Sequence, residues 1–79
     1  MPTVPEPNEA QTLDRFAANL KRCRKRAGMS QEALGYECGL HRTEISLLER
    51  SGRAPRLWTI VQLARGLKIT AAELLDGIR

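Results

Sequence analysis

Few residues in this sequence could build a disulfide framework, a metal site or a catalytic centre. The 79 residues include two cysteines and one histidine. Cys23 and Cys38 are too few for a disulfide framework and lack the spacing of metal ligands, so we expect both to be buried as small apolar residues. The lone histidine, His41, has no partners that would complete a metal site or a nucleophile–base pair. The sequence therefore predicts no enzyme activity, no metal, no cofactor and no small-molecule ligand.

Long apolar runs and aromatic residues are also scarce. No stretch approaches the ~20 apolar residues needed to span a bilayer, and the first residues lack the basic-then-apolar pattern of a signal peptide. We therefore expect a cytoplasmic protein without a membrane partner. The sequence has one Phe, one Tyr and one Trp, which disfavours RNA binding by base stacking. No segment alternates apolar and polar residues with a period of two, so no sheet is expected.

Basic residues are present in excess. Thirteen Lys and Arg stand against nine Asp and Glu, for a formal charge of +4. Two of the acids, Glu6 and Glu9, lie in the first twelve residues, so thirteen basic and seven acidic side chains remain from Leu13 onward. This balance indicates a polyanionic partner, most commonly nucleic acid. The alternative is that the basic charge only aids solubility. The length fits one domain with a thin core, which pairing with a second copy would stabilise.

The chain divides into a tail and one helical domain. Residues 1–12 hold three of the four prolines and almost nothing apolar, so we interpret them as a flexible tail. Residues 13–79 contain apolar residues at three- and four-residue steps, which predicts amphipathic helices. The first runs from Leu13 to the residues before Gly28, and a capping box at residues 70–73 opens the last, which carries Leu74, Leu75 and Ile78. Between them a helix after Pro55 is expected to turn these residues inward: Leu57, Ile60, Val61, Ala64 and Leu67.

Two short helices in the middle of the chain form the pattern of a helix-turn-helix at about residues 31–50. Ser30 is a good N-cap for a helix from Gln31 to Cys38, and Gly39 suits the sharp turn that follows. Gly35 has no side chain, which allows the two helices to approach closely. The second helix opens at His41 or Arg42 and ends at Ser51 and Gly52. Such a helix fits the DNA major groove, where its N-terminal residues reach base edges.

The segment GMSQEALGYECGLHRTEISLLERSGRAP resembles the helix-turn-helix of Cro and phage repressors, the xenobiotic-response-element family. The resemblance extends from about Leu20 to Leu75. It implies an all-α, five-helix, lambda-repressor-like domain that binds double-stranded DNA as a homodimer on a palindromic site, and so acts as a transcriptional regulator. The Gly-Leu-His-Arg-Thr-x-Ile-Ser run is particularly similar to the controller proteins of restriction–modification systems.

The resemblance also implies roles for individual residues. Gln31 matches a glutamine that grips a phosphate and supports the recognition helix, and Arg24 and Glu49 match an ion pair that ties the first helix to it. Positions matching Arg42, Thr43 and Ser46 touch bases or nearby phosphates, and Leu47 beside them could meet a thymine methyl. The loop from Arg50 to Arg53 matches a phosphate-contacting loop. The expected DNA-binding residues are Gln31, His41, Arg42, Thr43, Ser46, Leu47, Arg50, Ser51 and Arg53.

The sequence departs from the family pattern at four positions. His41 stands where Ser, Thr or Asp usually caps the recognition helix, and Gly35 replaces the usual Ala. Ser51 is inserted before Gly52, and Arg56 stands where a cap for the fourth helix is common. The His41 and Ser51 departures bear on the aim of the recognition helix.

Two further questions stay open at the level of the sequence. Trp58 lies beside the inward stripe of its helix and is either a partner-binding anchor or a half-buried rim residue. We expect the dimer surface to include Trp58, Val61 and Arg65. The alternative function is an antitoxin, which covers a toxin protein and represses its own operon. That function calls for an extended segment to cover the toxin, and the tail is short for this purpose.

Overall fold

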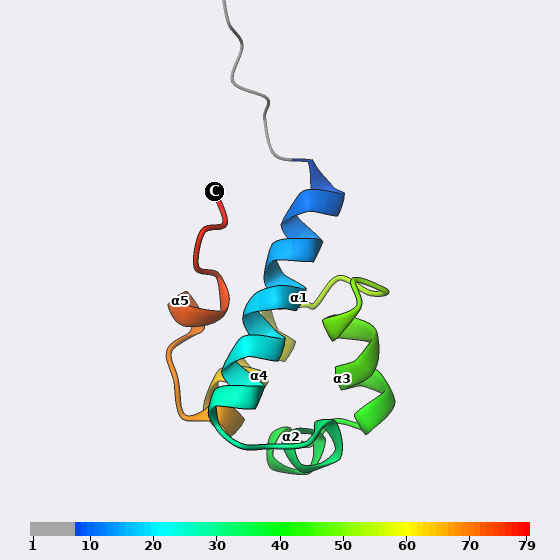
Figure 1. The fold of residues 1–79 in the computed structure, drawn as a ribbon, viewed down its shortest axis with the longest axis vertical. Coiled ribbons are helices and arrows are strands. Elements are labelled where there is room, and N and C mark those ends of the chain that lie inside the picture. Colours follow the sequence, from blue (N-terminus) through cyan, green and yellow to red (C-terminus); the bar gives the residue numbers. More distant parts are fainter. Residues whose placement is uncertain (1–7) are drawn as a thin grey trace, which may run out of the picture.

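The computed structural model describes residues 8–79, which form five α-helices and no strand (Figure 1). The predicted all-α, five-helix fold is confirmed. Helices α3 and α5 lie on opposite sides of α1, so α3 has an outer face that is free of α5 (Figure 1). None of the helices between residues 8 and 79 is long and apolar enough to cross a membrane. The helices are α1 Glu9–Arg26, α2 Gln31–Cys38, α3 Arg42–Glu49, α4 Leu57–Leu67 and α5 Ala71–Leu74.

Helix α1 begins four residues earlier than expected. Asn8 Oδ1 accepts a hydrogen bond from the Gln11 backbone N–H at 2.8 Å, and Gln11 Oε1 accepts one from the Asn8 N–H at 3.2 Å. This is a capping box built from Asn and Gln. The prediction of a tail over residues 1–12 is therefore wrong for residues 9–12, because polar composition concealed a local helix start. Residues 1–7 lie outside the described part of the chain.

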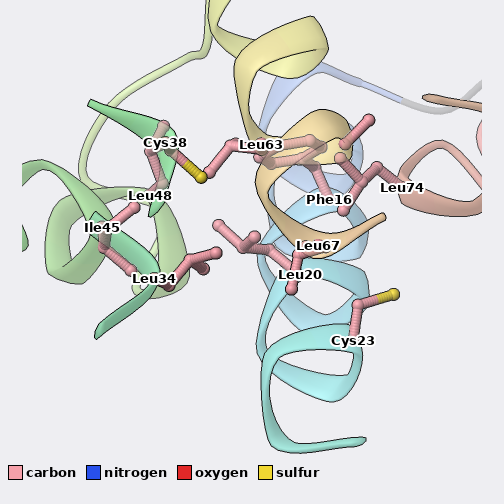
Figure 2. Packing of buried hydrophobic residues seen from close by; sticks show 11 residues of the cluster. Phe16, Leu20, Cys23, Leu34, Cys38, Ile45, Leu48, Leu63, Leu67 and Leu74 are labelled. Carbon is pink, nitrogen blue, oxygen red and sulfur yellow. The ribbon is translucent and has the colours of Figure 1, made fainter. Parts of the chain in front are cut away.

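The core draws side chains from all five helices (Figure 2). Cys23 and Cys38 are both buried in it, as expected. Full burial of a leucine side chain stabilises the fold by about 1.5–3 kcal/mol, and six aliphatic side chains are almost completely inaccessible: Leu20, Leu34, Ile45, Leu48, Leu63 and Leu74.

The predicted inward stripe of α4 is partly wrong. Ala64 and Leu67 are buried as predicted, and Ile60 and Val61 are half-buried. Leu57, however, is 77% exposed, and the helix also buries Thr59 and Leu63, which were not predicted. The reason is a contact between α2 and α4 at Gly66, where an added Cβ would collide with Cys38 Sγ. This close approach rotates α4 toward α2 and turns Leu57 outward.

The C-terminal segment is held by a residue that the apolar pattern did not reveal. Asn19 on α1 is fully buried, and its Nδ2 donates to the backbone oxygens of Leu74 and Asp76, both at 2.9 Å. Helix α5 ends at Leu74, so the expectation that it also carries Leu75 and Ile78 is wrong. Asn19 satisfies carbonyl groups that a longer helix would have bonded internally.

Only half of the predicted capping box at α5 is formed. Thr70 Oγ1 accepts from the Glu73 N–H at 3.3 Å. The Glu73 carboxylate turns away from the Thr70 backbone and lies 3.3 Å from Arg26 on α1. The Glu73 carboxylate thus pairs with Arg26 of another helix and does not complete the cap that the local pattern predicted.

Candidate nucleic-acid interface

The turn between α2 and α3 is set by two glycines. Gly39 ends α2 with φ of 71°, in the left-handed region that glycine adopts without strain. The next residue, Leu40, donates its N–H to Gly35 O at 2.8 Å. A Cβ on Gly35 would lie 2.5 Å from Leu40 O, so the chain passes α2 too closely for a side chain there. The predicted close approach is confirmed, and it fixes the angle at which α3 leaves α2.

His41 is the N-cap of the recognition helix α3. Its Nδ1 accepts a hydrogen bond from the Thr43 backbone N–H at 3.1 Å. An imidazole nitrogen does here what a Ser or Asp oxygen usually does at this position. Because Nδ1 must be unprotonated to accept, the cap requires the neutral imidazole. His41 thus lies at the start of the outer face of α3, and its Nδ1 is already engaged in a hydrogen bond with the protein backbone.

An ion pair joins α1 to the end of α3. Arg24 Nε and Nη2 lie 2.6 and 3.0 Å from the two carboxylate oxygens of Glu49. Only 11% of the Arg24 side chain and 4% of the Glu49 side chain are exposed. The expected Arg24–Glu49 pair is therefore formed, and it is bidentate. The hydrogen bonds that Arg24 donates to the Glu49 carboxylate raise the pKa of Arg24 above its already high usual value.

Two further hydrogen bonds extend this pair into a network. Arg24 Nη1 donates to the backbone oxygen of Met29, which lies just before α2. Gln31 Nε2 donates to Glu49 Oε1 at 3.2 Å, so the first residue of α2 also contacts the last residue of α3. Three helices are thus connected through one carboxylate, which holds α3 in a fixed position.

The outer face of α3 carries the side chains that the sequence assigned to DNA. Arg42 and Thr43 are exposed at its N-terminal end, and Ser46 and Leu47 are half-buried one turn further on. Leu47 is partly covered by the loop that follows, because a Cβ on Gly52 would lie only 3.0 Å from Leu47 Cδ2. The helix presents small and basic side chains at the end that would enter a groove.

The loop after α3 is tied back to the protein at two points. Ser51 has φ of 61° and donates its hydroxyl to Asp14 Oδ1 on α1 at 2.6 Å. Arg53 Nη1 donates to Glu44 Oε1 on α3 at 2.7 Å. Neither contact was predicted, because each joins residues whose proximity depends on the fold. Arg50, the C-cap of α3, remains exposed beside them.

The three residues expected at the dimer surface share one face of α4. Trp58 is 53% exposed, and the Arg65 guanidinium lies 5.7 Å from the centre of its ring, within range of a cation–π contact. Val61, between them along the helix, is half-buried.

The residues between 8 and 79 contain no cluster of three or more potential metal ligands. Burial raises the pKa of the Cys38 thiol to about 11, helped by the nearby Glu37 charge. The thiol is therefore protonated at neutral pH and a weak nucleophile.

Cys38 is expected to resist alkylation while the protein is folded. In a Cys23→Ala variant, iodoacetamide at pH 8 should modify folded Cys38 about 100-fold more slowly than the unfolded chain, because the thiolate fraction falls by that factor as the pKa rises from 9.0 to about 11. Mass spectrometry with and without urea measures the two rates. Equal rates would show that the thiol is reactive in the folded protein.

The model of a helix-turn-helix domain family matches residues 15–76, which include all five helices except the start of α1. The chain belongs to this helix-turn-helix family. The resemblance predicted from the sequence is thereby confirmed.

Proteins similar to this chain include a control protein and a restriction–modification controller protein. Control protein C.BamHI of Bacillus amyloliquefaciens is 43% identical over 51 residues, 65% of this chain and 63% of that protein. The crystal structure of the restriction–modification controller protein C.AhdI from Aeromonas hydrophila has a TM-score of 0.77 at 37% identity, and the match covers 78% of this chain and 94% of that one.

A third relative is a hypothetical transcription factor of Neisseria meningitidis, 36% identical over 69 residues, 87% of this chain and 65% of that protein. Its crystal structure has a TM-score of 0.79, at 36% identity, with coverage of 92% of this chain and 86% of that one. The matches to C.BamHI and to this factor each span slightly less than two thirds of the relative's length.

Proposed function

We propose that this protein is a sequence-specific DNA-binding transcriptional regulator that controls a restriction–modification operon. The observation that carries the proposal is the outer face of α3, where Arg42 and Thr43 are exposed at the end of a helix held by the Arg24–Glu49 pair. A major groove admits one α-helix, and its base edges are read by side chains at that end. The similarity to controller proteins supports the choice of operon.

In this proposal the residues divide into two groups. Arg42, Thr43, Ser46 and Leu47 read base edges, and His41 fixes the helix start beneath them. Gln31, Arg50, Ser51 and Arg53 contact the phosphates on either side, where contacts set register and affinity with little sequence information. The net positive charge draws the protein to DNA.

The protein acts as a homodimer in the cytoplasm and needs no cofactor. One recognition helix reads only a few base pairs, so two copies on an inverted repeat supply the remaining specificity. The dimer surface is placed on α4, around Trp58, Val61 and Arg65. No observation on the described residues favours an antitoxin, and the relatives named above are controller proteins and a hypothetical transcription factor.

The experiment that tests the proposal is a genomic pull-down with the full chain, followed by footprinting of the enriched site. We expect an inverted repeat with half-sites one helical turn apart, ~34 Å, next to genes for a nuclease and a methyltransferase. Sedimentation at micromolar concentration should give twice the monomer mass. A strictly monomeric protein that protects one asymmetric half-site would contradict the dimer, and the absence of any enriched duplex would contradict DNA binding.

A further inference from the structure

Glu44, which contacts Arg53, is an acidic side chain on the DNA-binding side that the proposed function leaves unexplained. Glu44 lies in the first turn of α3, next to Thr43, and its carboxylate would repel phosphates. Its oxygen lies 2.7 Å from Arg53 Nη1, with 27% of the Glu44 side chain and 52% of the Arg53 side chain exposed. The carboxylate is thus partly covered, while the guanidinium remains accessible.

This contact restricts the orientation of the Arg53 side chain and leaves most of its N–H groups free to donate. A guanidinium has five N–H groups in a rigid, planar fork. Glu44 takes one of its nitrogens, and no other partner for Arg53 occurs among the described residues. This contact with α3 therefore restricts the directions in which the remaining N–H groups point. An arginine held in this way is able to meet a phosphate only where the register of α3 on the DNA places that phosphate correctly.

We propose that Glu44 is a specificity-determining residue that acts through Arg53. On the operator, the base contacts of α3 fix the register, so the oriented Arg53 meets a phosphate and the pair strengthens binding. On random DNA no register is fixed, Arg53 gains little, and the carboxylate repels the backbone. One side chain thereby raises operator affinity and lowers random affinity. This inference rests on the proposed DNA-binding function.

The test compares wild-type protein with a Glu44→Gln variant on operator and scrambled duplexes of equal length. The variant should bind random DNA more tightly and the operator no better than wild type, so the ratio of the two affinities should fall about two- to fivefold, the range expected for a partly exposed charge pair. A Glu37→Gln variant is the matched control. Glu37 is an exposed residue of α2, so its substitution makes the same change of charge. The backbone of Glu37 packs against Gly66 of α4. The ratio of operator affinity to random-DNA affinity in this control should equal that of the wild-type protein.

A second pair of variants tests whether the effect passes through Arg53. In an Arg53→Gln background, adding Glu44→Gln should raise both affinities by the same factor and leave their ratio unchanged, because only the loss of repulsion remains. This cycle isolates the coupling between the two residues. Thermal unfolding of each variant identifies any loss of fold, and Arg53→Gln breaks the same contact without altering the first turn of α3.

Two results would overturn the inference. The first is an unchanged affinity ratio in Glu44→Gln. The second is a loss of operator affinity of similar size with and without Arg53, which would make Glu44 a direct reader of a cytosine amine. Both are distinct from failure of the proposed function, in which the wild-type protein itself shows no preference for any duplex.

Discussion

Replacing Glu49 by alanine is expected to lower the free energy of unfolding by about 3 kcal/mol. The substitution removes the acceptor of the Arg24 guanidinium, whose side chain is only 11% exposed. A buried charge without its partner loses both its Coulomb attraction and its hydrogen bonds, while its lost hydration is not restored. Arg24 keeps its bond to Met29 O, which holds the loss toward the lower end of the range for broken buried pairs. Urea unfolding at fixed protein concentration measures the change.

The matched control is Glu73→Ala, which breaks the Arg26–Glu73 contact of 3.3 Å on the surface. Both of these side chains are well exposed, so water and salt screen the pair, and the loss should stay below about 0.5 kcal/mol. If Glu49→Ala also costs less than about 1 kcal/mol, then the pair is well solvated in solution and is not what fixes α3 against α1.

Replacing Arg42 by alanine is expected to abolish most of the preference for the operator. Arginine offers guanine a two-pronged hydrogen bond worth ~1–3 kcal/mol of discrimination, and Arg42 is the first residue of the recognition helix, where base edges are in reach. Affinity for the operator should therefore fall by about 10- to 100-fold, and affinity for a scrambled duplex far less. The fold should be unaffected, because Arg42 has only an exposed contact with Glu32 at 3.7 Å.

Arg50→Ala provides the comparison, because Arg50 is an exposed arginine at the other end of the same helix. A phosphate contact there should make both affinities fall by similar factors and flatten the log–log salt dependence by roughly one unit. Titrations at several salt concentrations separate the two roles. If Arg42→Ala lowers both affinities equally, Arg42 is a phosphate anchor, and base reading passes to Thr43 or Ser46.

Features that depend on neighbours in sequence were predictable. Ser30 caps α2, Gly39 turns the chain into α3, and Gly35 leaves room for Leu40, each through contacts within a few residues. The start of α1 is encoded just as locally, in Asn8 and Gln11, although the polar, proline-rich composition of residues 1–12 predicts a tail there. The Arg24–Glu49 pair was expected only because the whole segment resembles a known family.

The sequence by itself therefore determined that the chain forms five helices with a turn between the second and third, since periodicity and capping act locally, and its net charge predicts a polyanionic partner. Only the tertiary structure decided which face of α4 is buried, that Asn19 binds the C-terminal carbonyls, and that Glu44 holds Arg53. These outcomes depend on how close two helices approach and how they are rotated, as at Gly66 against Cys38. Packing sets such distances collectively, so no single segment of the sequence specifies them.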